Sequence, residues 1–318
     1  MQTITAAVAA YNAEPWIGEA LEAILGQTRP PEEIVVVDDG STDGTARVLA
    51  GFGDAIRVVH RPNGGCPAAF NTAFAEAHGD FVAMCGADDI WEPHKLEWQA
   101  ETLAAHPEVD VLFGDARVIG EHRPAGLTSE RLADDLYTEG VPAGVLDGRM
   151  LRDRLYRGNF ICAPSIAIRR SLFARLGPFI EDYGADDYEY WMRCLRAGAT
   201  FFYDARPLLS YRRHESNLSS KLLWMAQCSH DVHVRYADFI EDRALVREIL
   251  AEDLFRIARG LVDEDRPGAA SAAFRASLRQ RRDPRALIWI AILALPPALR
   301  ERTGSKFVHL SRALAELG

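Results

Sequence analysis

The sequence predicts an α/β fold in which helices flank a mainly parallel β-sheet. Short apolar runs alternate with helical patterns across the first 113 residues, an order typical of βαβ units with parallel strands. Two of these runs, Ile34–Val37 and Phe81–Cys85, are followed closely by a pair of aspartates. Strands of an open α/β sheet bind ligands in the crevice at their carboxyl ends. Acids at two such ends therefore indicate a binding site.

The elements of residues 1–113 follow from apolar periodicity and from turn residues. Pro15 suits the first turn of a helix, and apolar pairs from Trp16 to Leu25 recur every four residues as one stripe. Gly79 is a plausible helix stop. The expected strands are Ile4–Ala10, Ile34–Val37, Ile56–Val59, Phe81–Cys85 and Val109–Phe113. Further helices are expected over Thr42–Leu49, over Pro67–His78 and from Pro93.

The rest of the chain is less regular. Residues 114–155 have a weak pattern, which suggests a long loop or insertion, and order returns with a strand over Ala163–Ile168. Asp186–Ala197 reads as a helix with Gly198 at its end. Beyond about residue 221 the sequence is helical and rich in Ala, Arg and Glu. We therefore expect a main domain over residues 1–220 and a helical extension over 221–318.

Composition restricts the class of protein. The formal charge of −10 over 318 residues argues against a nucleic-acid partner, because such sites need dense Lys and Arg. Five scattered cysteines favour reduced thiols in a cytosolic protein over a disulfide framework. The N-terminus lacks the basic segment of a signal peptide, and the apolar run Ala286–Leu299 is broken by prolines and too short to span a bilayer. We expect a cytoplasmic protein, with membrane-surface contact left open.

Three pairs of acids are the candidate chemistry. Asp38-Asp39 and Asp88-Asp89 each follow a strand, and Asp186-Asp187 opens a helix. Turn formation or helix capping explains one acid, but not a pair at two strand ends. Hard carboxylate oxygens at a strand end suit Mg²⁺ or Mn²⁺, which take substrate phosphates as further ligands. The third pair suits either the helix dipole or a general base beside a substrate hydroxyl.

These motifs, in this order, resemble family 2 glycosyltransferases of the GT-A fold, and the resemblance covers residues 3–220. It implies a nucleotide-binding half over 1–113 and an acceptor-binding half over 114–220. The segments that carry it are Val8–Asn12, Val37–Thr45, Gly79–Val82, Ala87–Pro93, Gly177–Phe179, Asp187–Arg193 and Tyr211–Ser219.

The resemblance also implies a role for each site residue. Ala9, Tyr11 and Asn12 would lie in the strand and loop under the nucleotide base, with Tyr11 near its face. Asp39 would hydrogen-bond the base, uracil if the donor is a UDP-sugar, and Asp88 would lie near the ribose and donor sugar. Asp89 would ligate the metal, Mn²⁺ or Mg²⁺, and His214 would contact the metal or the diphosphate. Asp187 would be the catalytic base, with Asp186 as the alternative.

Three positions depart from the family pattern. Gly86 stands where many members carry an additional Asp, and Phe70 occupies a position that is often Arg. Asp186 replaces a usual Glu beside the base. The first two departures put one acidic ligand and one contact to the diphosphate or sugar in question.

The implied activity is inverting transfer of a sugar from a nucleotide-sugar donor to a saccharide or lipid-linked acceptor, most often in bacterial surface polysaccharide or glycoconjugate synthesis. The alternatives are a sugar nucleotidyltransferase and a non-catalytic nucleotide-sugar-binding protein. The first should show an N-terminal Gly-rich, basic phosphate loop, which the opening lacks. Arg281, Arg282, Arg285, Arg300 and Arg302 flank an apolar helix in the extension, so docking to an anionic membrane stays open.

Overall fold

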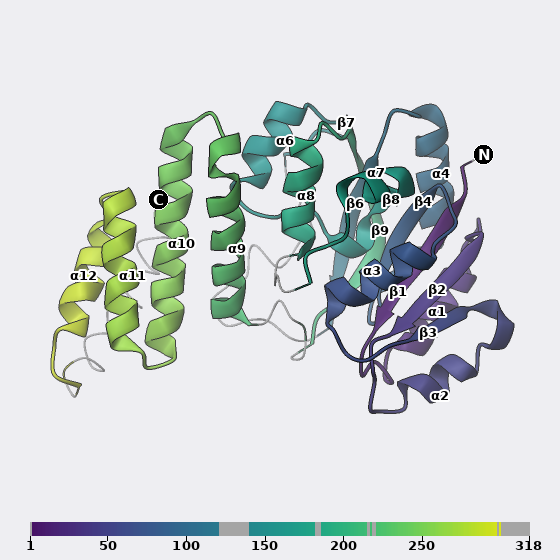
Figure 1. The fold of residues 1–318 in the computed structure, drawn as a ribbon, viewed down its shortest axis with the longest axis horizontal. Coiled ribbons are helices and arrows are strands. Elements are labelled where there is room, and N and C mark those ends of the chain that lie inside the picture. Colours follow the sequence, from purple (N-terminus) through teal and green to yellow (C-terminus); the bar gives the residue numbers. More distant parts are fainter. Residues whose placement is uncertain are drawn as a thin grey trace. The chain divides into compact units, whose positions relative to one another are not determined.

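The computed structural model describes residues 2–120, 140–181, 186–214, 217, 221–297 and 299. The chain divides into two compact units, residues 1–220 and residues 221–318. The first unit contains a nine-stranded sheet, and the second is made of helices (Figure 1).

The sheet has the order β3-β2-β1-β4-β8-β6-β9-β5. Its first four strands are parallel: β1 (Ile4–Ala10), β2 (Glu33–Asp38), β3 (Arg57–His60) and β4 (Phe81–Gly86). The remaining strands in this order are β8 (Ala167–Arg169), β6 (Val111–Ile119), β9 (Phe201–Arg212) and β5 (Ile90–Trp91). Antiparallel pairing occurs on both sides of β8 and between β5 and β9, and β7 (Gly144–Val145) pairs with β9. The expected α/β fold is thereby confirmed, with a mixed sheet.

Helices cover both faces of the parallel strands. α1 (Ile17–Leu25), α2 (Thr45–Ala50) and α4 (Lys95–Ala105) share one core with alternate residues of β1, β2 and β4, as the period of two in a strand requires. α3 (Cys66–Glu76) packs on β1 and β2 from the other face (Figure 1). The short η1 (Gly53–Ala55) lies between α2 and β3 in the chain.

The second half of this unit departs from the sequence-based expectation. Residues 148–155 form a helix, α6 (Gly148–Leu155), inside the stretch expected to be a long loop. Pro164 fixes its backbone in a short 3₁₀ helix, η2 (Ala163–Ser165), where a strand was expected. Two further helices follow, α7 (Arg170–Leu176) and α8 (Asp186–Arg196). Residues 121–139 of the weak segment lie outside the described residues.

The strand β9 was missed because Pro207 interrupts its apolar pattern. A proline cannot donate to a ladder, and the β6–β9 register shifts on either side of the Asp115–Pro207 pair. This irregularity lets the strand run on to Arg212, which brings the segment beyond it to the end of β4.

The second unit contains α9 (Leu222–Tyr236), η4 (Ala237–Phe239), α10 (Arg243–Asp263), α11 (Pro267–Gln280) and α12 (Pro284–Leu293). Figure 1 shows the four α-helices side by side, each packed on the next. Their core joins Phe274 of α11 to Trp289 of α12 by ring stacking. No helix among the described residues has the length and apolar composition that crossing a bilayer requires.

Candidate functional site

The first strand-end motif holds Asp39 in a fixed position. The Asp39 amide donates to the Ala10 carbonyl at 2.8 Å, which continues the β1–β2 ladder past its last pair. The buried Asp39 carboxylate accepts the backbone N–H groups of Gly64 and Gly65, the latter at 2.7 Å, and lies 3.4 Å from the Arg61 guanidinium. These contacts fix the carboxylate at the end of β2.

Asp38 and Asn12 shape the loops around Asp39. Asp38 accepts the amide of Ser41 and lies 3.0 Å from His60 Nδ1. Asn12 has a positive φ of 47°, donates its amide to Ser41 Oγ, and accepts the Thr42 amide at 2.8 Å. Both side chains therefore order the motif.

Two other residues expected at the nucleotide lie near the end of β1 and directly after it. Ala9 pairs with Val37 on one side and with Gly86 on the other, so it sits between the two acidic motifs. The neighbouring Tyr11 is 51% exposed, and its ring is accessible to a planar ligand.

The second strand-end motif is joined to a distant segment of the chain. Because β5 pairs with β9 directly after Asp88-Asp89, residues beyond β9 reach the end of β4. His214 Nε2 lies 2.8 Å from Asp88 Oδ2, and the Asn217 amide donates to the same oxygen at 3.1 Å. The His214 ring stacks on Trp16, with centroids 4.2 Å apart. The structure thus brings Asp88 and His214 together, with Asp88 on the accessible side.

Asp89 occupies a different environment from Asp88. Its carboxylate is buried, accepts the Arg212 backbone N–H at 3.1 Å, and has a pKa well above the usual range because of burial and the charge of Asp88. The Arg212 guanidinium donates to the Asp88 carbonyl.

The departure at Gly86 has a steric explanation. A Cβ at this position would lie 2.6 Å from Asp89 Oδ2 and 2.8 Å from Asp88 Oδ1. Such distances are too short for a side chain, so the two carboxylates occupy the space where many family members have another acid. Phe70, the other departure, is a buried residue of α3.

The third acidic pair lies at the start of α8. Asp187 Oδ2 accepts the side-chain amide of Asn159 at 3.0 Å, and Asn159 is oriented by the Ile161 N–H, which it accepts at 3.1 Å. Burial raises the pKa of Asp187. Burial and the neighbouring charge of Asp187 raise the pKa of Asp186 to about 8. The backbone N–H of Tyr188 and the Asn159 amide both donate to Asp187, and these hydrogen bonds oppose the effect of burial on its pKa.

Cys66, at the start of α3, shows that the three acidic motifs lie near one another. Its pKa is raised well above the usual range by burial and then by the charges of four acids, Asp186, Asp187, Asp88 and Asp39. The thiol is nevertheless solvent-accessible. Cys66, at the N-terminus of α3, therefore lies near the ends of β2 and β4 and near the start of α8.

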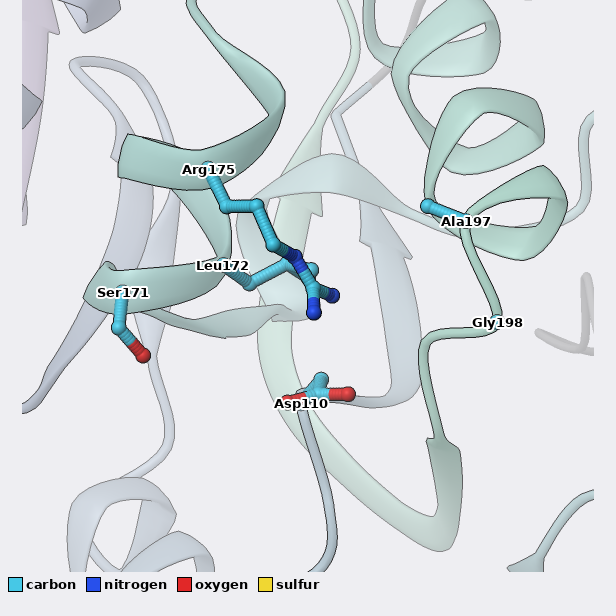
Figure 2. Close-up of a pocket in the computed structure, with 6 residues that line it drawn as sticks. All are labelled: Asp110, Ser171, Leu172, Arg175, Ala197 and Gly198. Atoms are coloured by element: carbon cyan, nitrogen blue, oxygen red, sulfur yellow. The ribbon is translucent and has the colours of Figure 1, made fainter.

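A cavity lies elsewhere in this unit. A cavity of about 380 Å³ is lined by Asp110, Ser171, Leu172, Arg175, Ala197 and Gly198 (Figure 2). Asp110 precedes β6, which runs parallel to β4 because both are antiparallel to β8. The cavity is thus at the opposite edge of the sheet from Asp88, and none of the expected site residues lines it.

The donor set fits a divalent cation that keeps water and phosphate ligands. Within the described part of the chain no three His, Cys, Asp or Glu side chains are grouped to hold a metal ion. Asp88 Oδ2 and His214 Nε2 are joined by a hydrogen bond of 2.8 Å, and two metal ligands at about 2.1 Å and a right angle are separated by a similar distance, about 3 Å. Mg²⁺ and Mn²⁺ often take only one or two protein ligands, with substrate phosphates and water completing the shell.

Several residues of the site were not anticipated. Trp16, Arg212 and Asn217 support Asp88-Asp89 or His214, and the backbone of Gly64 and Gly65 supports Asp39. Gly64 and Gly65 follow Asn63, and this combination of residues is typical of a turn. Asp88 and Asn217 are 129 residues apart in the sequence, so no local sequence pattern indicates that they are in contact.

The fold and the acids at its strand ends define a GT-A type of α/β protein. The model of the family described as "Glycosyl transferase family 2" matches residues 5–177, more than half of the chain. The chain belongs to this family.

Individual proteins resemble the chain at lower levels of identity. An uncharacterized glycosyltransferase of Rickettsia felis is 30% identical over 247 residues, which cover 76% of this chain and 39% of that protein. The chain spans 37% to 64% of the length of the first three curated relatives it matches.

Two solved structures share the fold. S. aureus TarS 1-349 in complex with UDP-GlcNAc has a TM-score of 0.64 at 20% identity, over 91% of this chain and 84% of that one. The mannosyltransferase PcManGT of Pyrobaculum calidifontis, in complex with GDP-Man and Mn²⁺, has a TM-score of 0.57 at 21% identity, over 99% and 87% of the two chains.

Proposed function

We propose that this protein is an inverting, metal-dependent glycosyltransferase that moves a sugar from a nucleotide-sugar donor, a UDP-sugar, to an acceptor hydroxyl. The observation that carries the proposal is the convergence of Asp39, Asp88 and Asp187 around Cys66. Such an arrangement offers a base-reading acceptor, a cation ligand and a proton acceptor near one another. Family membership and the nucleotide-sugar complexes of two proteins with the same fold support it.

Each acid has a separate task in this proposal. Asp39 accepts a hydrogen bond from the base, and Tyr11 lies against the base face. Asp88 and His214 hold the cation, while the buried Asp89 fixes the strand end behind them through Arg212. This assignment moves the metal-ligating role expected for Asp89 to Asp88, because Asp88 is the accessible carboxylate of the two, and it leaves Asp89 a structural role. When bound, the cation neutralises charge on the departing diphosphate.

Asp187 acts as the general base. Its carboxylate takes the proton from the acceptor hydroxyl as that oxygen bonds to the anomeric carbon, and the bond from that carbon to the diphosphate oxygen breaks. The nucleoside diphosphate leaves with the electron pair, and configuration inverts because attack comes from the opposite side. The acceptor is a saccharide or lipid-linked hydroxyl, and the setting is synthesis of bacterial surface glycans at the cytoplasmic side.

The Asp187→Asn variant tests the base assignment. Asn retains the shape and can still accept from Asn159, so UDP binding with Mn²⁺, measured by isothermal titration, should stay unchanged. The turnover number should fall about 10²- to 10⁴-fold, the usual contribution of a general base. Asp54→Asn, at an exposed site, is the matched control. Near-normal turnover in Asp187→Asn contradicts the assignment, and donor binding without turnover in the wild type would indicate a sensor.

The metal assignment has its own test. Asp88→Asn and His214→Gln should each weaken Mn²⁺ binding to the UDP complex by at least about tenfold, since each removes one of two protein ligands. Asp43→Asn is the control because Asp43 accepts only from the Thr45 amide and hydroxyl and from the Glu14 amide, and it contacts neither Asp88 nor His214. Unchanged Mn²⁺ affinity in both site variants, or full activity with EDTA, would refute the role of this pair.

A further inference from the structure

The last helix of the second unit has two apolar faces, and only one of them is covered. Ala286, Trp289, Ile292 and Leu293 of α12 are buried in the helical core. On the other side Leu287 is 59% exposed and Ile288 is 42% exposed. A helix that is apolar all round needs an apolar environment on both faces. The outer face of α12 is therefore an incomplete interface.

Exposed apolar side chains are concentrated at this end of the chain. Single exposed apolar residues are normal on a protein surface. Among the described residues, however, three of the eight large exposed apolar side chains lie within thirteen positions of one another: Leu287, Ile288 and Leu299. This clustering distinguishes the patch from background exposure.

Charge is also distributed unevenly along the chain. Residues 267–318 contain nine Lys and Arg but three Asp and Glu, a formal charge of +6, whereas the other 266 residues carry −16. A sign reversal of this size indicates a separate interaction surface with an anionic partner.

The arginines near α12 fall into two groups. Arg281 and Arg285 form ion pairs with Glu248 and Glu252 of α10, which fastens the end of α11 and the start of α12 to the core. In contrast, Arg275, Arg279 and Arg282 are exposed, and no ion pair joins them to any residue that the structure describes. Their spacing of four and three residues places them along one side of α11 and its end.

We infer that the outer face of α12 docks on an anionic lipid bilayer, with Arg275, Arg279 and Arg282 at the headgroups. An interfacial helix binds through buried apolar area together with attraction between basic side chains and anionic lipids. A nucleic acid would use the arginines but leave the Leu and Ile side chains without a partner. A second copy of the chain would bring two segments of charge +6 together. An anionic bilayer satisfies both features, and the inference is independent of the proposed reaction.

Vesicle flotation of the full-length protein tests this inference. We expect it to float with vesicles of phosphatidylcholine and phosphatidylglycerol, and not with phosphatidylcholine alone. Leu287→Gln combined with Ile288→Gln should weaken binding roughly 30-fold, because apolar area is lost. Replacing Arg275, Arg279 and Arg282 by Gln should weaken it roughly 100-fold at low salt, and added salt should reduce the difference.

The controls use equally exposed side chains of α9 and α10. Leu222→Gln with Val234→Gln matches the apolar change, and Arg235, Arg247 and Arg256 replaced by Gln match the change in charge. Both controls should float like the wild type, and circular dichroism checks that all variants fold. Equal binding to neutral vesicles, or equal loss in site and control variants, overturns the inference. So does a dimer, seen by sedimentation, that Leu287→Gln with Ile288→Gln dissociates while flotation stays unchanged.

Discussion

At the scale of single residues, the two acids at the start of α8 differ in their surroundings. Asp186 has a pKa of about 8, because it is buried beside the charge of Asp187, and so it is neutral at pH 7. Asn159, held by the Ile161 amide, donates to Asp187, which favours the ionised form of that carboxylate. This hydrogen bond is consistent with the role of general base that we propose for Asp187.

The Asp186→Asn variant should change the alkaline side of the pH profile. Above about pH 8 the wild-type Asp186 gains a negative charge that repels a donor diphosphate, so the Michaelis constant for the donor should rise roughly fivefold. Asn stays neutral and should remove that rise. Because the folded pKa of Asp186 is raised, the wild type also loses stability as pH rises from about 4 to 8, and Asn should remove this slope as well.

The measurements are donor kinetics from pH 6 to 9.5 and urea unfolding at pH 5 and 8, with Asp54→Asn as the control. An alkaline rise in the Michaelis constant that persists in Asp186→Asn would assign it to another group.

At the scale of the elements, α4 begins with a charged group in the apolar core. Lys95 is fully buried, its Nζ lies 4.1 Å from the centroid of the Trp91 ring in β5, and it donates to Gln99, which in turn donates to the Ser165 carbonyl of η2. Burial lowers the pKa of Lys95 to about 7. The Lys95 amine thus links α4, β5 and η2 behind the Asp88-Asp89 turn. Because its pKa is lowered, it loses its proton at a lower pH than an exposed lysine does.

Lys95→Met should alter how stability depends on pH. Between pH 7 and about 10.5 the unfolded chain keeps the Lys95 proton that the folded chain has lost, so wild-type stability rises with pH in this window. Met abolishes that contribution. From pH 7 to 9.5 the unfolding free energy of the wild type should therefore increase by roughly 3 kcal/mol relative to Lys95→Met. Denaturant unfolding at the two pH values measures this, and Lys221→Met, at an exposed site, should show no such change. Parallel pH dependence of wild type and Lys95→Met would mean that Trp91 and Gln99 keep Lys95 charged.

At the scale of the whole molecule, the sequence pattern predicted the helices and strands that form through interactions between nearby residues. The strands β1 to β4 and their helices follow from apolar periodicity, and so does the location of Asp39 at a strand end and of Asp187 at a helix start. The strand β9 did not follow, because its pairing with β6 tolerates Pro207 only through a register shift. The contact between His214 and Asp88 depends on that strand and on a two-residue pairing with β5. The formal charge of −10 for the whole chain likewise did not indicate that residues 267–318 are basic.

The pairing of β5 with β9 also determines when Asp88 and His214 can come together while the chain is being synthesised. Asp39 and its loop partners all lie within the first 65 residues, so the base-reading end can order as soon as β1 and β2 have paired. Asp88 must wait for His214, which is translated 126 residues later. At about 5–20 residues per second, this delay lasts roughly 6 to 25 s. A nascent chain can therefore order the loop around Asp39 well before Asp88 meets His214, because that contact requires β9 to have docked.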